Sequence, residues 1–176
     1  MQKTVILIAI IIILMNAAGC DKGIEPLPEK VVTPGVMGFS GKVTFTGTWP
    51  SGVMRTHIVV FKDQIKTSDD FFPPNLSFVI DSIPYRSSEF SYNSVDNNFI
   101  SVFKLAPGNY NYIVVAQSKT PLLSLDRKDW FIVGVYYKGT DLTVPGVLTL
   151  NDGIMTTGVN IRVDFNNPPP QPPGGQ

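Results

Sequence analysis

The sequence predicts an all-β domain, an antiparallel β-sandwich of seven or eight strands. Short segments in which apolar and polar residues alternate are separated by clusters of Gly, Pro, Asn and Asp. β-branched and aromatic residues are concentrated in these segments, and after residue 20 no helical periodicity extends beyond two turns. Many short strands with turn residues between them are typical of two packed antiparallel sheets.

Each strand is expected from its own pattern. Segment 39–46 places Phe39, Val43 and Phe45 on one face and polar residues on the other, with period two. Segment 56–61 is a nearly continuous apolar run, which suits a strand that is covered on both faces. The same criteria predict further strands at 76–83, 98–105, 110–117, 130–137, 147–150 and 159–165.

These strands place the domain at residues 36–167. Before it, segment 20–35 contains three prolines and mixed charges without periodicity, and we interpret it as a tether that could reach up to roughly 45 Å. After it, segment 168–176 is rich in Pro and Gly and is expected to be a solvated, extended tail. An alternative role for this tail is as a docking motif for an aromatic groove.

The N-terminus has the pattern of an export signal at residues 1–19. Lys3 precedes an apolar run at 5–15, and small residues follow. This run is well short of the roughly 20 residues that a membrane-spanning helix needs. The sequence therefore predicts a cleaved signal and not a permanent span.

Ala17-Ala18-Gly19-Cys20 resembles the lipobox of bacterial lipoprotein precursors. The resemblance implies cleavage before Cys20, lipidation of its sulfur, and attachment to a membrane of the cell envelope through the lipid. The expected location is the outer membrane, on its periplasmic or surface side. The alternatives are an ordinary signal peptide with a chance cysteine and an uncleaved anchor.

Composition narrows the possible partners. Cys20 is the only cysteine, so the mature domain cannot form an internal disulfide. The formal net charge is zero and no block of like charge occurs, so we expect no nucleic-acid partner.

One turn is more specific than the general β pattern. Residues 105–110 read Leu-Ala-Pro-Gly-Asn-Tyr, in which Pro107 fixes φ, Gly108 is free to take a positive φ and Tyr110 opens a strand. With the segments around 39–43 and 58–61, this turn resembles the prealbumin-like sandwich modules, which occur as carboxypeptidase regulatory-like and collagen-adhesin B-type domains. The resemblance implies a prealbumin- or immunoglobulin-like fold and an envelope setting, and it carries no catalytic residue across.

The sequence offers no catalytic, metal or cofactor site. His57 is the only histidine and lies within an apolar strand, where we expect a structural, hydrogen-bonded role. Ser101 and Lys104 have the spacing of serine-lysine acyl enzymes, but on a strand this spacing puts them on opposite faces. The acidic residues at 69–70 and 126–129 lack the pattern of a calcium loop.

We therefore expect a non-enzymatic binding or structural accessory module, with a hydrolase of transthyretin-like fold as the alternative. Four aromatic residues in loop-like segments are candidates for contact with a glycan or an envelope protein: Phe71, Phe72, Tyr85 and Tyr92. The alternative for these side chains is that they cover the open end of the sandwich as a satellite core.

Overall fold

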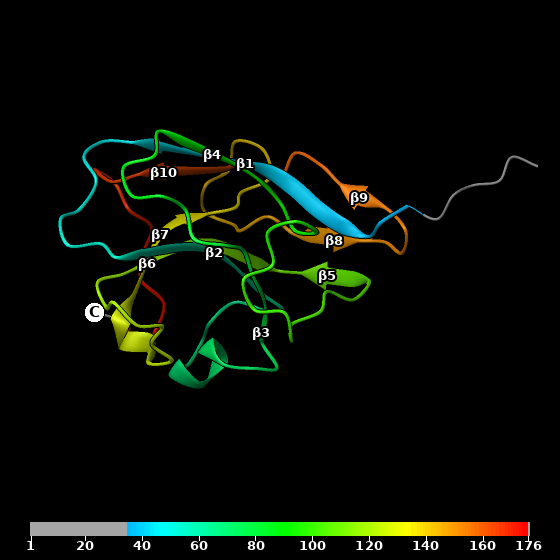
Figure 1. The fold of residues 1–176 in the computed structure, drawn as a ribbon, viewed down its shortest axis with the longest axis horizontal. Helices are drawn as coiled ribbons and strands as arrows, with labels where there is room; N and C mark the ends of the chain where they lie inside the picture. Colours follow the sequence, from blue (N-terminus) through cyan, green and yellow to red (C-terminus); the bar gives the residue numbers. More distant parts are fainter. Residues whose placement is uncertain (1–34, 176) are drawn as a thin grey trace, which may run out of the picture. The chain divides into compact units, whose positions relative to one another are not determined.

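A single curled β-sheet of mixed direction dominates the computed structural model, which describes residues 35–175 (Figure 1). The strand order is β3-β2-β6-β7-β10-β1-β4, with β9 paired to one end of β1, and β5 and β8 form a separate pair. The strands are β1 Gly38–Thr46, β2 Arg55–Phe61, β3 Leu76–Val79, β4 Glu89–Asn93, β5 Gly108–Tyr110, β6 Tyr112–Ser118, β7 Trp130–Val135, β8 Leu148–Leu150, β9 Met155–Thr156 and β10 Ile161–Asp164. Two short 3-10 helices are η2 Ser68–Phe71 and η3 Arg127–Asp129.

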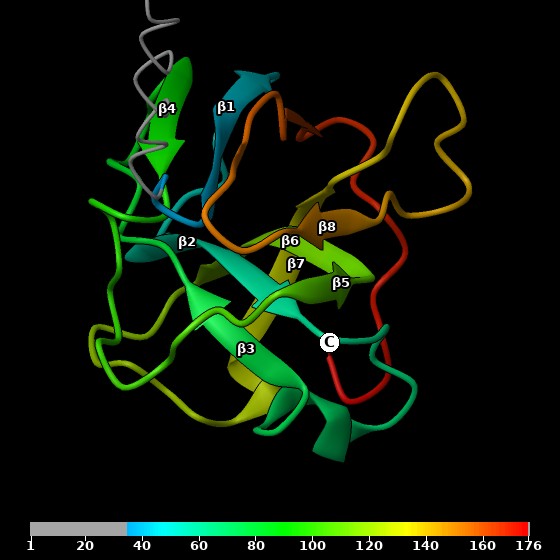
Figure 2. The ribbon, with the colours of Figure 1, turned by 90° about the vertical axis from the view of Figure 1, so that its right-hand side faces the viewer.

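The curl of the sheet encloses the main core. In Figure 1 the strands β1, β4 and β10 lie above β2 and β6, and Figure 2 shows β5 and β8 side by side at one end. Side chains from both halves of the sheet meet between them, because alternate residues of each strand point inward. The fully buried members of this cluster include Phe39, Val43, Ile58, Val60, Ile113, Val115, Ile161 and Val163.

The two strands with the clearest patterns are confirmed. In β1, Val43 and Phe45 are buried while Thr44 and Thr46 are exposed, as the alternation predicts. In β2, Ile58 and Val60 enter the main core, whereas Val59 and Phe61 enter a second cluster on the other side of the strand. A continuous apolar run therefore does mark a strand that is covered on both faces.

The prediction of a purely antiparallel arrangement is wrong. β1 pairs in parallel with β10, with Val43 opposite Ile161, and also in parallel with β9. Alternation of apolar residues shows which face of a strand is buried, but it is the same whichever way the neighbouring strand runs. The all-β class is confirmed, whereas two strand pairings are parallel instead of antiparallel.

Two segments differ from the strand prediction. Segment 98–105 forms turns instead of a strand, with a single bridge between Asn98 and Ile80, and Phe99, Ile100 and Phe103 pack from these turns on the second cluster. Segment 89–93, expected to be an irregular aromatic stretch, is the edge strand β4, which pairs with β1. An edge strand pairs on one side only, so a weak pattern is sufficient for it.

The turn at 105–110 is confirmed in its geometry. Gly108 has φ of 136°, outside the range that side chains favour. The hydroxyl of Tyr110 donates to the carbonyl of Ala106 at 2.9 Å and accepts its N–H at 3.0 Å, which closes the turn.

The predicted signal peptide 1–19, Cys20 and nearly all of the tether 20–35 lie outside the described residues. Between residues 35 and 175, no helix has the length and apolar character needed to cross a membrane.

Candidate functional site

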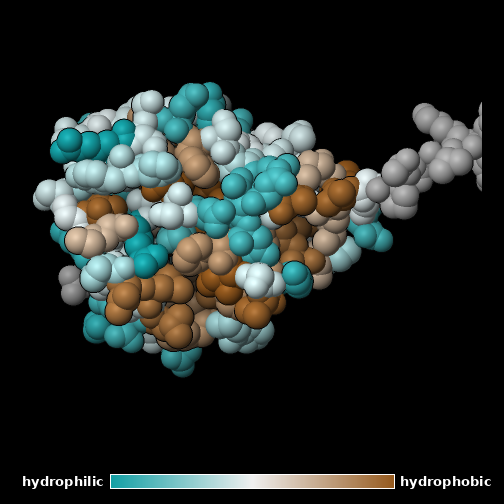
Figure 3. Space-filling model, viewed as in Figure 1, coloured by the Kyte–Doolittle hydropathy of each residue, from teal (hydrophilic) through white to brown (hydrophobic). Residues whose placement is uncertain are grey.

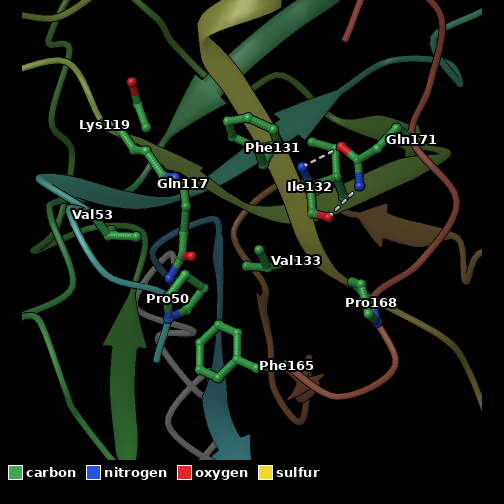
Figure 4. A pocket seen from close by; sticks show the side chains of 11 residues that line it. Pro50, Val53, Gln117, Lys119, Phe131, Ile132, Val133, Phe165, Pro168 and Gln171 are labelled. Carbon is green, nitrogen blue, oxygen red and sulfur yellow. Dashed lines mark hydrogen bonds between the residues drawn. The ribbon is translucent and has the colours of Figure 1, made fainter. Parts of the chain in front are cut away.

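An apolar pocket of about 300 Å³ lies where the ends of β6 and β7 meet the chain that follows β10 (Figure 4). We call it the Gln117 pocket, and its volume is at the lower end of the range for small-molecule sites. Its apolar lining consists of Pro50, Val53, Phe131, Ile132, Val133, Phe165 and Pro168, and its polar lining consists of Gln117, Ser118, Lys119 and Gln171.

Pairing of neighbouring strands assembles this pocket from segments far apart in the sequence. Gln117 of β6 lies opposite Phe131 of β7 in the antiparallel ladder. Pro50 comes from the connection between β1 and β2, and Phe165 directly follows β10. β10 and β7 are neighbours in the sheet, so Phe165 after β10 lies close to the residues of β7 that line the pocket.

The amide of Gln117 gives the pocket its chemical character. The residue is 2% exposed, and its Nε2 has no hydrogen-bond partner among the described residues. Figure 4 shows this amide directed toward Pro50 and the ring of Phe165. A buried donor without a partner costs about 1–3 kcal/mol, so an acceptor oxygen that reaches Nε2 would offset this cost.

The rim of the Gln117 pocket carries a cation and two aromatic rings. Lys119 is exposed and makes no ion pair within the described part of the chain. The Trp49 ring lies 5.1 Å from that of Phe165 and 5.5 Å from that of Tyr85. The hydroxyl of Tyr85 donates to the carbonyl of Pro50 at 3.3 Å. Of the four predicted aromatic residues, Tyr85 is the one that bonds to a residue lining this pocket, Pro50.

The other three predicted aromatics do not line the Gln117 pocket. Phe71 is buried in the second cluster with its ring 6.0 Å from that of Phe61, as the satellite-core alternative expects. Phe72 follows it and is 36% exposed. Tyr92 is 4% exposed in the main core, where its hydroxyl donates to the carbonyl of Val159 and burial raises its pKa.

An exposed apolar surface is also present. Leu122 and Leu125, in the segment between β6 and η3, are 78% and 65% exposed. Figure 3 shows apolar side chains gathered on one part of the face seen in Figure 1. Contiguous exposed apolar surface is typical of contact sites with other molecules.

His57 is structural in its geometry. Its ring is fully buried, and Nδ1 lies 3.0 Å from the carbonyl oxygen of Ile80. A carbonyl oxygen only accepts, so Nδ1 carries the hydrogen and Nε2 is left as an acceptor. Burial lowers the pKa of the imidazole, and Nε2 has no partner among the described residues. The neutral ring thus fits the expected structural role.

The other chemistry candidates occupy turns. Ser101 and Lys104 are both exposed in the segment that replaces the predicted strand. The carboxylate of Asp70 accepts the N–H groups of Lys66 and Thr67, which lowers its pKa, and Asp129 accepts the hydroxyl of Ser124. Within residues 35–175, no group of three or more potential ligand side chains could hold a metal ion.

Sequence reasoning missed the Gln117 pocket, although one signal was present. Residues 112–118 form a fully buried strand in which Gln117 is the only residue with an amide side chain. An amide in an apolar strand needs a partner, so it marks a position with a special environment. The walls of the pocket, in contrast, come from segments whose proximity no local pattern predicts.

No protein-family model, no curated protein and no solved structure matches the chain.

Proposed function

We propose that this protein is a lipid-anchored module of the bacterial cell envelope that binds a ligand non-covalently in the Gln117 pocket. The observation that carries the proposal is the buried amide of Gln117 in a largely apolar pocket, because its Nε2 has no hydrogen-bond partner within residues 35–175. A protein gains stability by filling such a position with an apolar residue, so keeping an amide there is a cost that ligand binding offsets.

The ligand class follows from the lining of the pocket. Phe131 and Phe165 offer ring surface, and Gln117 offers a donor for a carbonyl or hydroxyl oxygen. A volume of about 300 Å³ suits one sugar ring or one large side chain. Trp49 and Tyr85 continue the aromatic surface at the rim, where further parts of a glycan or of a protein partner would lie.

Anchoring and fold complete the proposal. The lipobox-like residues 17–20 support lipidation of Cys20 in the outer membrane, on its periplasmic or surface side. The closed turn at 105–110 supports a prealbumin-like arrangement of the curled sheet. The proposal contains no catalytic step, because the only histidine of the chain is fully buried and its Nδ1 is engaged.

A binding screen against glycan and peptide arrays tests the proposal, with Gln117→Leu beside the wild-type protein. Leu keeps the volume of the site and removes the donor, so we expect a ligand of this pocket to bind at least about tenfold more weakly, since tenfold is about 1.4 kcal/mol. The variant should also gain about 1–3 kcal/mol in its free energy of unfolding, because an unpartnered buried amide is removed. Urea denaturation measures this gain.

Phe72→Ala is the matched control for the screen. Phe72 lies beside η2 and does not line the Gln117 pocket, so its loss should leave binding unchanged. A ligand that Gln117→Leu retains and Phe72→Ala loses would move the site to the aromatic loop and refute the pocket assignment.

A further inference from the structure

The start of β7 has an open side that the C-terminal segment covers. β10 pairs only with Gly134 and Val135 of β7. At Ile132 the side chain of Gln171 takes the place of a strand: the N–H of Ile132 donates to Oε1 at 2.9 Å, and Nε2 donates to the carbonyl of Ile132 at 2.8 Å. One side-chain amide thus reproduces the two bonds of a paired residue in a β-ladder.

A buried arginine forms the second anchor for this segment. Arg127 is 4% exposed, and its Nη2 donates to the carbonyl of Pro172 at 3.1 Å. Within the described residues it makes no ion pair with a carboxylate, and its Nε has no hydrogen-bond partner. The guanidinium therefore depends on peptide carbonyls for the partners that a buried charge needs.

The spacing of the segment matches this surface closely. A Cβ added at Gly174 would lie 2.9 Å from Cβ of Ser68, and one added at Gly175 would lie 2.5 Å from Nη2 of Arg127. Only glycine fits at these two positions without displacement of the neighbours. The surface is therefore complementary to the pattern Gln-Pro-x-Gly-Gly, which residues 171–175 provide.

We infer that the open side of β7, together with Arg127, is a binding site for an extended Gln-Pro-x-Gly-Gly peptide of a second polypeptide, and that the chain's own residues 171–175 occupy this site in cis. Prolines at 168–170, 172 and 173 have no N–H to donate, so the segment is held by side-chain contacts and not by a backbone ladder. A peptide of the same sequence from a second polypeptide would make the same contacts, so it competes with residues 171–175 for this site.

This site is distinct from the ligand position in the Gln117 pocket, although Pro168 and Gln171 border both. The peptide contacts the backbone of Ile132 and the Arg127 guanidinium, whereas the pocket ligand is assigned to the amide of Gln117. The peptide site can therefore be tested independently of the proposed ligand of the Gln117 pocket.

The test is fluorescence anisotropy of a labelled synthetic peptide with the sequence of residues 167–176. It is titrated with the full chain as wild type, Gln171→Ala and Gly175→Val. Both variants weaken the occupant in cis, so we expect them to bind the peptide at least tenfold more tightly than the wild type does. A peptide with Ala at the position of Gln171 should bind at least tenfold more weakly to both variants.

Lys42→Ala serves as the matched control, because the Lys42 side chain on β1 is exposed and its Nζ donates to Glu89, away from the C-terminal segment. It should keep the wild-type affinity for the peptide. Melting curves show which variants are folded, and Gly175→Val leaves the residues that bond to β7 unchanged. The inference is overturned if a folded variant binds no better than the wild type, or if the Ala peptide binds as well as the Gln peptide.

Discussion

At the residue scale, three buried polar side chains are the ones most relevant to the proposed function and to stability. Gln117, His57 and Arg127 are each buried, and each has one nitrogen without a partner among the described residues. Their surroundings differ: Gln117 lines an apolar pocket, His57 lies in the sheet against Phe99, and Arg127 holds the C-terminal segment. The same lack of a partner therefore occurs at the proposed ligand position, at a structural position and at the arginine that contacts the C-terminal segment.

Acidification should destabilise the protein through His57. Burial lowers its pKa from the ordinary value of 6.5, so between 6.5 and the lower folded value the unfolded chain binds a proton that the folded chain does not. Through His57, the free energy of unfolding should not change just above pH 6.5 and should fall below it, by up to about 1.4 kcal/mol per pH unit. Urea denaturation across this range measures the slope.

His57→Gln is the control for this titration, because His57 is the only histidine of the chain. The variant should lose the slope just below pH 6.5. The lowered pKa values of Asp70 and Asp129 act only below 3.8 and do not interfere. An equal slope in both proteins would show that the unfolded and folded states bind the same number of protons at His57.

At the scale of elements, β6 and β7 form the centre of the site. β6 is buried over its whole length between β2 and β7, which holds Gln117 rigidly at its end. β7 is shared by β6 on one side and by β10 over only two residues on the other. The short pairing with β10 leaves the side of β7 that residues 171–175 cover.

Gly108→Val tests the turn that leads into β5. Valine at φ of 136° is strained, so we expect a loss of about 1–3 kcal/mol in the free energy of unfolding. Steric overlap contributes little, because the nearest atom to an added Cβ is the flexible Nζ of Lys62 at 3.3 Å. Thermal denaturation measures the loss.

Asn109→Val is the comparison for this turn. Asn109 is exposed in β5, where a β-branched residue is well suited, and Val removes only the exposed hydrogen bond that its Oδ1 accepts from Thr149, so stability should change by no more than about 1 kcal/mol. Equal stability of the Gly108→Val variant and the wild type would mean that the backbone at Gly108 relaxes without strain.

On the scale of the whole molecule, the Gln117 pocket and the start of the domain lie at opposite ends of β1. The described chain enters at Gly35 beside Gly153, while Pro50 of the pocket follows the far end of β1. A strand of this length spans roughly 30 Å.

Cys20→Ala tests the anchoring. No other cysteine can accept a lipid, so we expect an uncleaved or mislocalised precursor without lipid-dependent membrane attachment. Fractionation of cells and mass spectrometry of the N-terminal peptide measure both effects. If the variant fractionates with membranes and is processed as the wild type is, the protein is not a lipoprotein.

The sequence alone determined the all-β class, the buried faces of β1 and β2 and the positive φ of Gly108, because each of these depends on local periodicity or on one residue's backbone freedom. It also indicated the structural role of His57. Only the tertiary structure decided that β1 and β10 run in parallel, that Tyr92 is buried, and that Gln117 faces a pocket. These features depend on contacts between segments far apart in the chain, and the pattern within a segment does not record which other segment covers it.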